Sequence, residues 1–186
     1  EYDFAKISKV LGRQVIEKRR CMGVWRYKEL MPVLDEWNMV TLYEGDTPLI
    51  RCENLGKKIG LKNFYVKDEG RNPTCSYKDR LIAVSASKAR EFNAKFMISH
   101  GGNTGAPCAA YGTRAGLPGV TLESPSVVRG EIALTIALGG KSVMFEDKSP
   151  PPFTAKRKIL MEAVKHGGYS VSPVGVHGTA EPYGHD

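Results

Sequence analysis

From Phe64 onward, short apolar runs alternate with amphipathic stretches, and this alternation constrains the fold more than any other feature of the sequence. The apolar runs, which predict strands, are Phe64–Lys67, Phe96–Ser99, Val120–Glu123, Ser142–Phe145 and Tyr169–Ser172. The stretches between them predict helices at about 78–92, 104–115, 129–138 and 153–166. Strands and helices that alternate at this pitch form crossover units, so we expect an α/β fold with a parallel sheet covered by helices on both faces.

The first third of the chain has a weaker pattern. Phe4, Ile7 and Leu11 follow a helical spacing that Gly12 weakens. Trp25–Leu34 mixes aromatic and basic residues around Pro32, which predicts a short helix or a wrapping arm.

Charge and hydropathy limit the kinds of partner that the chain can bind. No stretch approaches the ~20 consecutive apolar residues of a membrane helix, so we expect no membrane span. The formal net charge of +7 favours anionic partners. The basic residues are scattered, without an aromatic-interleaved stripe, which argues against nucleic acid. Small phosphorylated or carboxylated ligands fit this charge better.

The cysteines (Cys21, Cys52, Cys75 and Cys108) form no Cys-x-x-Cys pair, and the histidines are equally dispersed. This predicts free thiols in a reducing cytoplasm and no metal site. The chain begins at Glu1 without a charged-then-apolar leader, so we expect no signal peptide in this stretch and a piece of a longer chain.

Three loops lie where a predicted strand ends and a helix begins: Glu44–Leu49, Asn72–Arg80 and Ser99–Ala106. In open α/β sheets, ligands bind at these carboxyl ends of the strands. Lys78 begins a predicted helix, where the helix dipole disfavours an ammonium, and a desolvated lysine there becomes a nucleophile toward carbonyls. The glycines around Asn103 allow close backbone approach to a flat or anionic ligand, one crossover unit later.

Together with Val66–Gly70, the segments Glu44–Leu49, Asn72–Arg80 and Gly102–Ala106 resemble the motifs of threonine synthases and their relatives among the fold type II pyridoxal-phosphate enzymes. The resemblance extends from about Tyr2 to Asp186. It implies a two-domain enzyme of which this chain is the N-terminal half. Residues 1–94 would form an N-terminal arm and the first part of the large cofactor domain, and residues 95–186 the small mobile α/β domain.

The resemblance also implies roles for individual residues. Lys78 would bind pyridoxal 5'-phosphate as a Schiff base and move protons during the reaction. Asn103 would hydrogen-bond the ring hydroxyl of the cofactor, and Thr104, with backbone amides near Gly101, would bind the α-carboxylate of the substrate. The implied enzyme is a homodimeric lyase of threonine biosynthesis, which eliminates phosphate from O-phosphohomoserine and adds water to give threonine.

The sequence departs from the family pattern at several positions. Cys75 replaces a glycine three residues before the lysine, and His100 and Gly101 replace a pair of hydroxyl residues. Gly184 stands where an arginine helps to hold the substrate phosphate in the family. Loss of such a charge-assisted contact is costly.

These departures leave alternatives open. Basic residues elsewhere, such as Lys156 or Arg129, could hold the phosphate. A paralogous β-replacement or β-elimination enzyme of the cysteine-synthase type is a second interpretation, although the arm around Val24–Leu30 resembles threonine synthases more. A ligand-binding or assembly module without catalysis is a third.

Overall fold

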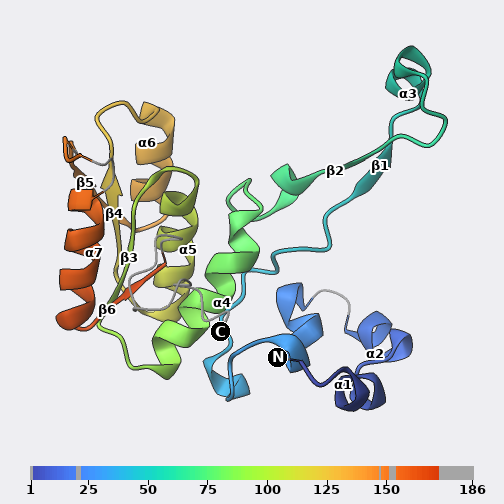
Figure 1. Cartoon of the computed structure of the whole chain (residues 1–186), viewed down its shortest axis with the longest axis horizontal. Helices are drawn as coiled ribbons and strands as arrows, with labels where there is room; N and C mark the ends of the chain where they lie inside the picture. Colours follow the sequence, from blue (N-terminus) through green and yellow to red (C-terminus); the bar gives the residue numbers. More distant parts are fainter. Residues whose placement is uncertain (1, 20–21, 147, 151–153, 172–186) are drawn as a thin grey trace.

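The computed structural model of the chain describes residues 2–19, 22–146, 148–150 and 154–171 (Figure 1). Its main body contains a four-stranded sheet in the order β5-β4-β3-β6, in which each pair of neighbours is parallel. The strands are β3 (Phe96–Ser99), β4 (Gly119–Glu123), β5 (Lys141–Met144) and β6 (Gly168–Ser170). The expected α/β fold with a parallel sheet is confirmed.

Helices cover this sheet on both faces. They are α4 (Lys78–Glu91), α5 (Gly105–Ala115), α6 (Arg129–Ala137) and α7 (Thr154–Lys165). Helix α7 covers one face, α5 and α6 cover the other, and α4 packs against α5 (Figure 1). All four predicted helices are present. The second begins one residue later than expected because a short 3-10 turn, η4 (Gly102–Thr104), precedes it.

The core has two parts because successive side chains of a strand point to opposite faces of the sheet. Met97 of β3 is fully buried and belongs to the larger cluster, which α4 and α5 complete. Its neighbour Ile98 belongs to a smaller cluster with Leu122 and Leu160, the latter from α7. Met97 and Ile98 therefore belong to cores on opposite faces of the sheet.

The strand expected at Phe64–Lys67 does not join the parallel sheet, which corrects the sequence-based expectation. Strand β2 (Tyr65–Lys67) pairs antiparallel with β1 (Leu49–Arg51) in a separate two-stranded ribbon. The ribbon projects from the body with α3 (Glu53–Ile59) at its far end (Figure 1). The chain reverses after α3 because Gly60 caps it in a left-handed conformation, φ 77°. The chain therefore runs out along β1 and back along β2 as an antiparallel pair, in place of the expected parallel crossover unit.

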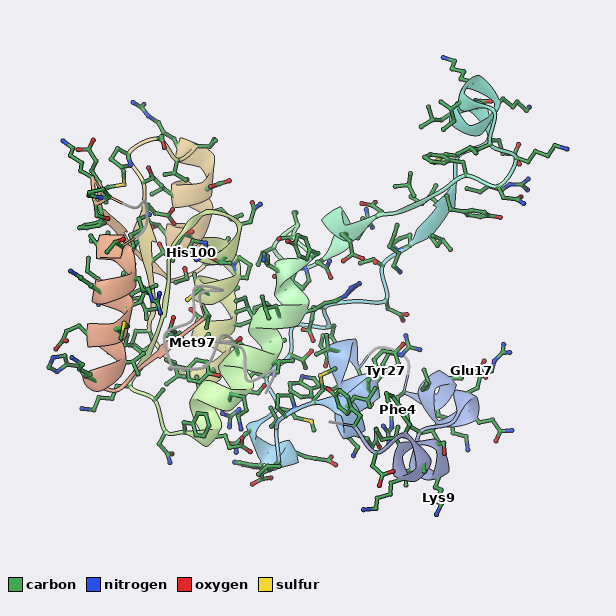
Figure 2. All side chains as sticks on the ribbon, viewed as in Figure 1. Phe4, Lys9, Glu17, Tyr27, Met97 and His100 are labelled. Atoms are coloured by element: carbon green, nitrogen blue, oxygen red, sulfur yellow. The ribbon has the colours of Figure 1, made fainter. Side chains whose placement is uncertain are left out.

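The N-terminal arm consists of α1 (Phe4–Val10), α2 (Arg13–Lys18), η1 (Gly23–Leu30) and η2 (Glu36–Asn38). The helix expected at the start is interrupted at Gly12, and the short helix expected near Trp25 is present as η1. The Trp25 indole is buried and donates a hydrogen bond to the Val40 carbonyl oxygen at 2.9 Å. In Figure 2, Phe4 and Tyr27 mark the lobe that this arm forms beside α4. In the described part of the chain, no helix is long and apolar enough to cross a membrane.

Candidate active site

Lys78 is the first residue of α4, and the loop before it is held by a buried carboxylate. The side chain of Asp79 accepts hydrogen bonds from the Thr74 backbone N–H at 2.8 Å and from the Thr74 hydroxyl at 2.6 Å. Burial raises the pKa of Asp79, and the hydrogen bonds from Thr74 oppose that rise. The start of α4 is thus fixed, and with it the backbone position of Lys78.

Glu69 connects the three segments that the sequence singled out on this side of the site. Its carboxylate accepts hydrogen bonds from Thr47 at 2.8 Å, from Asn72 at 2.9 Å and from Arg80 at 3.0 Å. Asn72 in turn accepts a hydrogen bond from the Gly45 N–H at 2.9 Å. Burial alone would raise the pKa of Glu69, but these hydrogen bonds and the charge of Arg80 bring it below its ordinary value. The residues of these motifs therefore form a hydrogen-bonded network that holds the loops near Lys78 together.

The loop after β3 adopts a backbone conformation that requires glycine. Gly101 has φ 85° and ψ −162°, a region that only glycine populates, and Gly102 has φ 63°. The buried Thr104 donates its hydroxyl hydrogen to the Gly101 carbonyl oxygen at 2.7 Å. The Glu123 carboxylate accepts a hydrogen bond from the Gly102 N–H at 3.0 Å. The Glu123 carboxylate and the Thr104 hydroxyl thus both hold the loop in place.

A pocket of about 400 Å³ opens between this loop, the start of α4 and the start of α7. All four predicted site residues line it, which brings together Lys78, Gly101, Asn103 and Thr104. The other lining residues are His100, Gly102, Glu123, Ser124, Ser126, Val127 and Lys156. The residues come from the start of α4, the loop after β3, the end of β4 with the loop that follows it, and α7. They therefore gather at the carboxyl ends of β3 and β4.

A second pocket of about 380 Å³ adjoins the first. Gly102 and Asn103 line both pockets, so the exposed Asn103 side chain lies between them. Thr74, Cys75 and other residues of the loop before Lys78 form the second pocket's wall. The loop before Lys78 and the loop that carries Asn103 therefore both line the second pocket.

His100 follows the end of β3 and is half-buried at the first pocket (Figure 2). Burial lowers the pKa of His100, and the positive charges of Lys156 and Lys78 lower it further. The lowered pKa favours the neutral form of the imidazole. Both ammonium groups lie close enough to His100 to act on it.

Cys75 occupies a left-handed backbone position, with φ 58°. A side chain in this region is strained, whereas glycine adopts it freely. The departure from the family's glycine at this position is thus visible as backbone strain in the loop before Lys78. Gly184, another departure from the family pattern, lies outside the described residues.

Sequence reasoning missed Glu123 as a site residue. It ends a predicted strand, Val120–Glu123, and a polar residue at the carboxyl end of a parallel strand is a usable signal for a site. Its hydrogen bond with Gly102 joins the end of β4 to the loop after β3, and residue spacing within either segment does not predict this contact.

The chain belongs to the family described as pyridoxal-phosphate dependent enzyme, which matches residues 40–184. It is 35% identical over 179 residues to a threonine synthase of Methanocaldococcus jannaschii, an alignment that covers 95% of this chain and 44% of the relative. It is 41% identical over 142 residues to a threonine synthase of Methanosarcina acetivorans, covering 75% of this chain and 34% of the relative. The chain thus spans less than half the length of these curated relatives. The resemblance to threonine-synthase-like enzymes and the expectation of pyridoxal phosphate as the family's cofactor are confirmed.

Two solved structures share the fold. O-acetyl serine sulfhydrylase isoform 3 from Entamoeba histolytica superimposes with a TM-score of 0.59 and 22% identity, covering 70% of this chain and 42% of that chain. O-ureido-L-serine synthase superimposes with a TM-score of 0.56 and 25% identity, covering 68% and 41%. Both are expected neighbours of a fold type II enzyme.

The residues around the pocket fit pyridoxal phosphate. Lys78 supplies a primary amine and Asn103 an amide to the lining of the same pocket. A Cβ added at Gly102 would meet no atom within 4 Å, so the glycine keeps the backbone bare where the two pockets join. A flat ring could approach such a surface closely.

Proposed function

We propose that the protein containing this chain is a pyridoxal-phosphate-dependent lyase of the threonine-synthase type, which eliminates phosphate from O-phosphohomoserine and adds water to give threonine. The observation that carries the proposal is the meeting of Lys78 and Asn103 in one pocket at the carboxyl edge of a parallel sheet. The 35% and 41% identities to threonine synthases support this substrate over others in the family.

Each residue has a distinct role in this proposal. The Lys78 amine attaches the cofactor covalently and, when free, moves a proton to and from the substrate carbon. Asn103 donates to the ring oxygen of the cofactor and orients the ring. Backbone N–H groups near Gly101 and the N-terminus of α5 at Thr104 bind the substrate carboxylate. Bound pyridoxal phosphate supplies an electron-withdrawing ring that stabilises negative charge at the substrate carbon.

The domain division and the assembly belong to the same proposal. Residues 1–94 form the arm and the first part of the large domain, and residues 95–186 the small mobile domain. The enzyme acts as a homodimer in the cytoplasm. The free thiols of Cys52, Cys75 and Cys108 support a reducing compartment, whereas Cys21 lies outside the described residues.

A β-replacement enzyme of the cysteine-synthase type is the second candidate. The 25% identity to O-ureido-L-serine synthase at a TM-score of 0.56 favours it, together with the change to His100 and Gly101 in the carboxylate-binding loop. The two candidates differ in the group that leaves the substrate. They share Lys78 and the cofactor.

A substrate comparison separates the two candidates. The complete protein, loaded with pyridoxal phosphate, is assayed for phosphate release from O-phosphohomoserine and for turnover of O-phosphoserine and O-acetylserine. We expect the highest kcat/KM for O-phosphohomoserine. A higher kcat/KM for either serine derivative would replace the proposal with the second candidate.

A further inference from the structure

Glu123 is a buried carboxylate at the end of β4, and the sheet fixes the position of its backbone. Only 1% of the residue is exposed. It pairs with Met144 of β5 in the parallel ladder, and its carbonyl oxygen accepts a hydrogen bond from the Phe145 N–H at 2.8 Å. Burying a carboxylate is costly unless polar groups compensate it. The groups that surround its two side-chain oxygens therefore indicate its role.

The two oxygens of Glu123 lie at the two ends of the short segment Gly102–Gly105. One oxygen accepts the hydrogen bond from the Gly102 N–H at 3.0 Å. A Cβ on Gly105, the first residue of α5, would stand 2.8 Å from the other oxygen. The positive end of the α5 dipole favours a carboxylate at this place. Since this second oxygen is buried without a hydrogen-bond partner among the described residues, its favourable interaction is with the end of the helix.

Asn103 lies in the middle of this segment, in the turn η4 that precedes α5. Its side chain is exposed, and no hydrogen bond to another described residue holds it. In the described part of the chain, the backbone of the segment therefore determines where the Asn103 amide lies. Glu123 and Asn103 line the same pocket as Lys78, so a shift of this backbone would move the amide relative to the lysine.

We propose that Glu123 is a positioning residue for Asn103. By holding the Gly102 and Gly105 ends of the segment, it presents the Asn103 amide to the ring oxygen of pyridoxal phosphate. The inference rests on the proposed function, which gives Asn103 its contact with the cofactor. Glu123 acts through the backbone of the segment and not by touching the cofactor. Its loss should therefore cost no more cofactor affinity than the loss of the Asn103 amide itself.

The test compares Glu123→Met with Glu146→Met in the complete protein. Methionine suits a buried position but carries no charge and is only a weak acceptor. Glu146 follows the neighbouring strand β5, pairs with Lys148 at 2.9 Å and has 61% of its side chain exposed, so it is the matched control. We expect Glu123→Met to raise the Kd for pyridoxal phosphate about fivefold and to shift the visible absorbance of the bound cofactor, and Glu146→Met to stay within about twofold. Equal Kd values for the wild type and Glu123→Met would overturn the inference.

A double-substitution cycle separates positioning from a merely structural role. In the Asn103→Ala background the amide is absent, so Glu123→Met should change the Kd for pyridoxal phosphate by less than about twofold. A structural Glu123 would cost the same factor in both backgrounds, and that result would overturn the inference. Glu123→Gln retains an acceptor for the Gly102 N–H and should bind the cofactor within about threefold of the wild type. Equal Kd values for Glu123→Gln and Glu123→Met would contradict the role of the Gly102 contact.

Hydrogen exchange tests the same contacts in the complete protein without the cofactor. The peptide that contains Gly102–Gly105 should exchange about tenfold faster in Glu123→Met than in the wild type, because both ends of the segment are released. Glu123→Gln is the gentler change and keeps this test available if Glu123→Met does not fold. Its segment should exchange about threefold faster, since the contact with the end of α5 is weakened. Exchange at the wild-type rate in Glu123→Gln would then overturn the inference.

The readouts separate this inference from the proposed function. If the wild type binds pyridoxal phosphate but releases no phosphate from O-phosphohomoserine, the proposed function fails. Coupling between Glu123 and Asn103 in cofactor binding would still support the positioning role in that case. If the wild type releases phosphate and the two residues contribute independently to cofactor binding, the proposed function stands and the inference is wrong.

Discussion

The Glu123 carboxylate accepts a hydrogen bond from the Gly102 backbone N–H at 3.0 Å and lies against the loop that carries Asn103. A Cβ at Gly101 would stand 2.3 Å from one Glu123 oxygen, and a Cβ at Gly105 would stand 2.8 Å from the other. The glycines of this loop therefore serve two purposes. They keep the backbone free of side chains where it faces the pocket, and they leave room for the buried Glu123 carboxylate against the loop.

A series of glycine-to-alanine substitutions tests this packing. Gly101→Ala combines the overlap with Glu123 and a glycine-only backbone conformation, so we expect a loss of about 2 kcal/mol or more in the free energy of unfolding. Gly102→Ala has open space but a positive φ and should cost about 1 kcal/mol. Gly130→Ala, in α6 with nothing within 4 Å, is the control and should be neutral or slightly stabilising. Urea unfolding of the three variants checks the order, and equal losses at Gly101 and Gly130 would contradict it.

Cys75→Gly tests the strain in the loop before Lys78. The left-handed φ of 58° costs a cysteine about 1–2 kcal/mol, whereas a glycine gives back about 0.5–1 kcal/mol through the greater freedom of the unfolded chain. We expect a net gain of about 0.5 kcal/mol in the free energy of unfolding, measured by thermal or urea denaturation. Cys52→Gly, at a residue with negative φ, is the control and should destabilise. A loss of stability in Cys75→Gly would show that the thiol makes a contact that outweighs the strain.

The Glu69 network predicts a pH dependence of stability. The pKa of Glu69 in the folded protein lies below its ordinary value of 4.5, so its contribution is present above pH 4.5 and is lost as the pH falls through the lowered value. Glu69→Gln should therefore be less stable than the wild type at pH 7, and the difference should shrink toward pH 3. Urea unfolding at both pH values measures it. A difference in the free energy of unfolding between Glu69→Gln and the wild type that grows as the pH falls would contradict this prediction.

Asn103→Ala tests the contact assigned to the cofactor ring. Removing a hydrogen bond to a partly charged oxygen should weaken pyridoxal phosphate binding by about 1–2 kcal/mol and shift the visible absorbance of the bound cofactor. Asn54→Ala, at an exposed position of α3, is the control. An unchanged spectrum with unchanged affinity in Asn103→Ala would remove this residue from the site.

Much of the parallel sheet and its helices could be predicted because elements such as β3 and α4 have a buried face with its own period. The buried residues of α4, which include Ile82, Ala86 and Ala89, and the apolar run of β3 are examples. The ribbon could not, since β1 is a three-residue strand with exposed side chains, too short to show a period. In the site, Lys78 and Asn103 follow from motifs in single loops. Glu123 required knowledge of a contact between the end of β4 and the loop after β3, and the structure alone supplies it.

The central claim is that Lys78 carries the cofactor. The complete protein is incubated with pyridoxal phosphate, reduced with borohydride and digested, and the modified peptide is sequenced by mass spectrometry. The account predicts the reduced cofactor on Lys78, and none on that peptide in Lys78→Ala. Modification of another lysine at full yield, for example Lys67 or Lys156, with Lys78 unmodified, would contradict it.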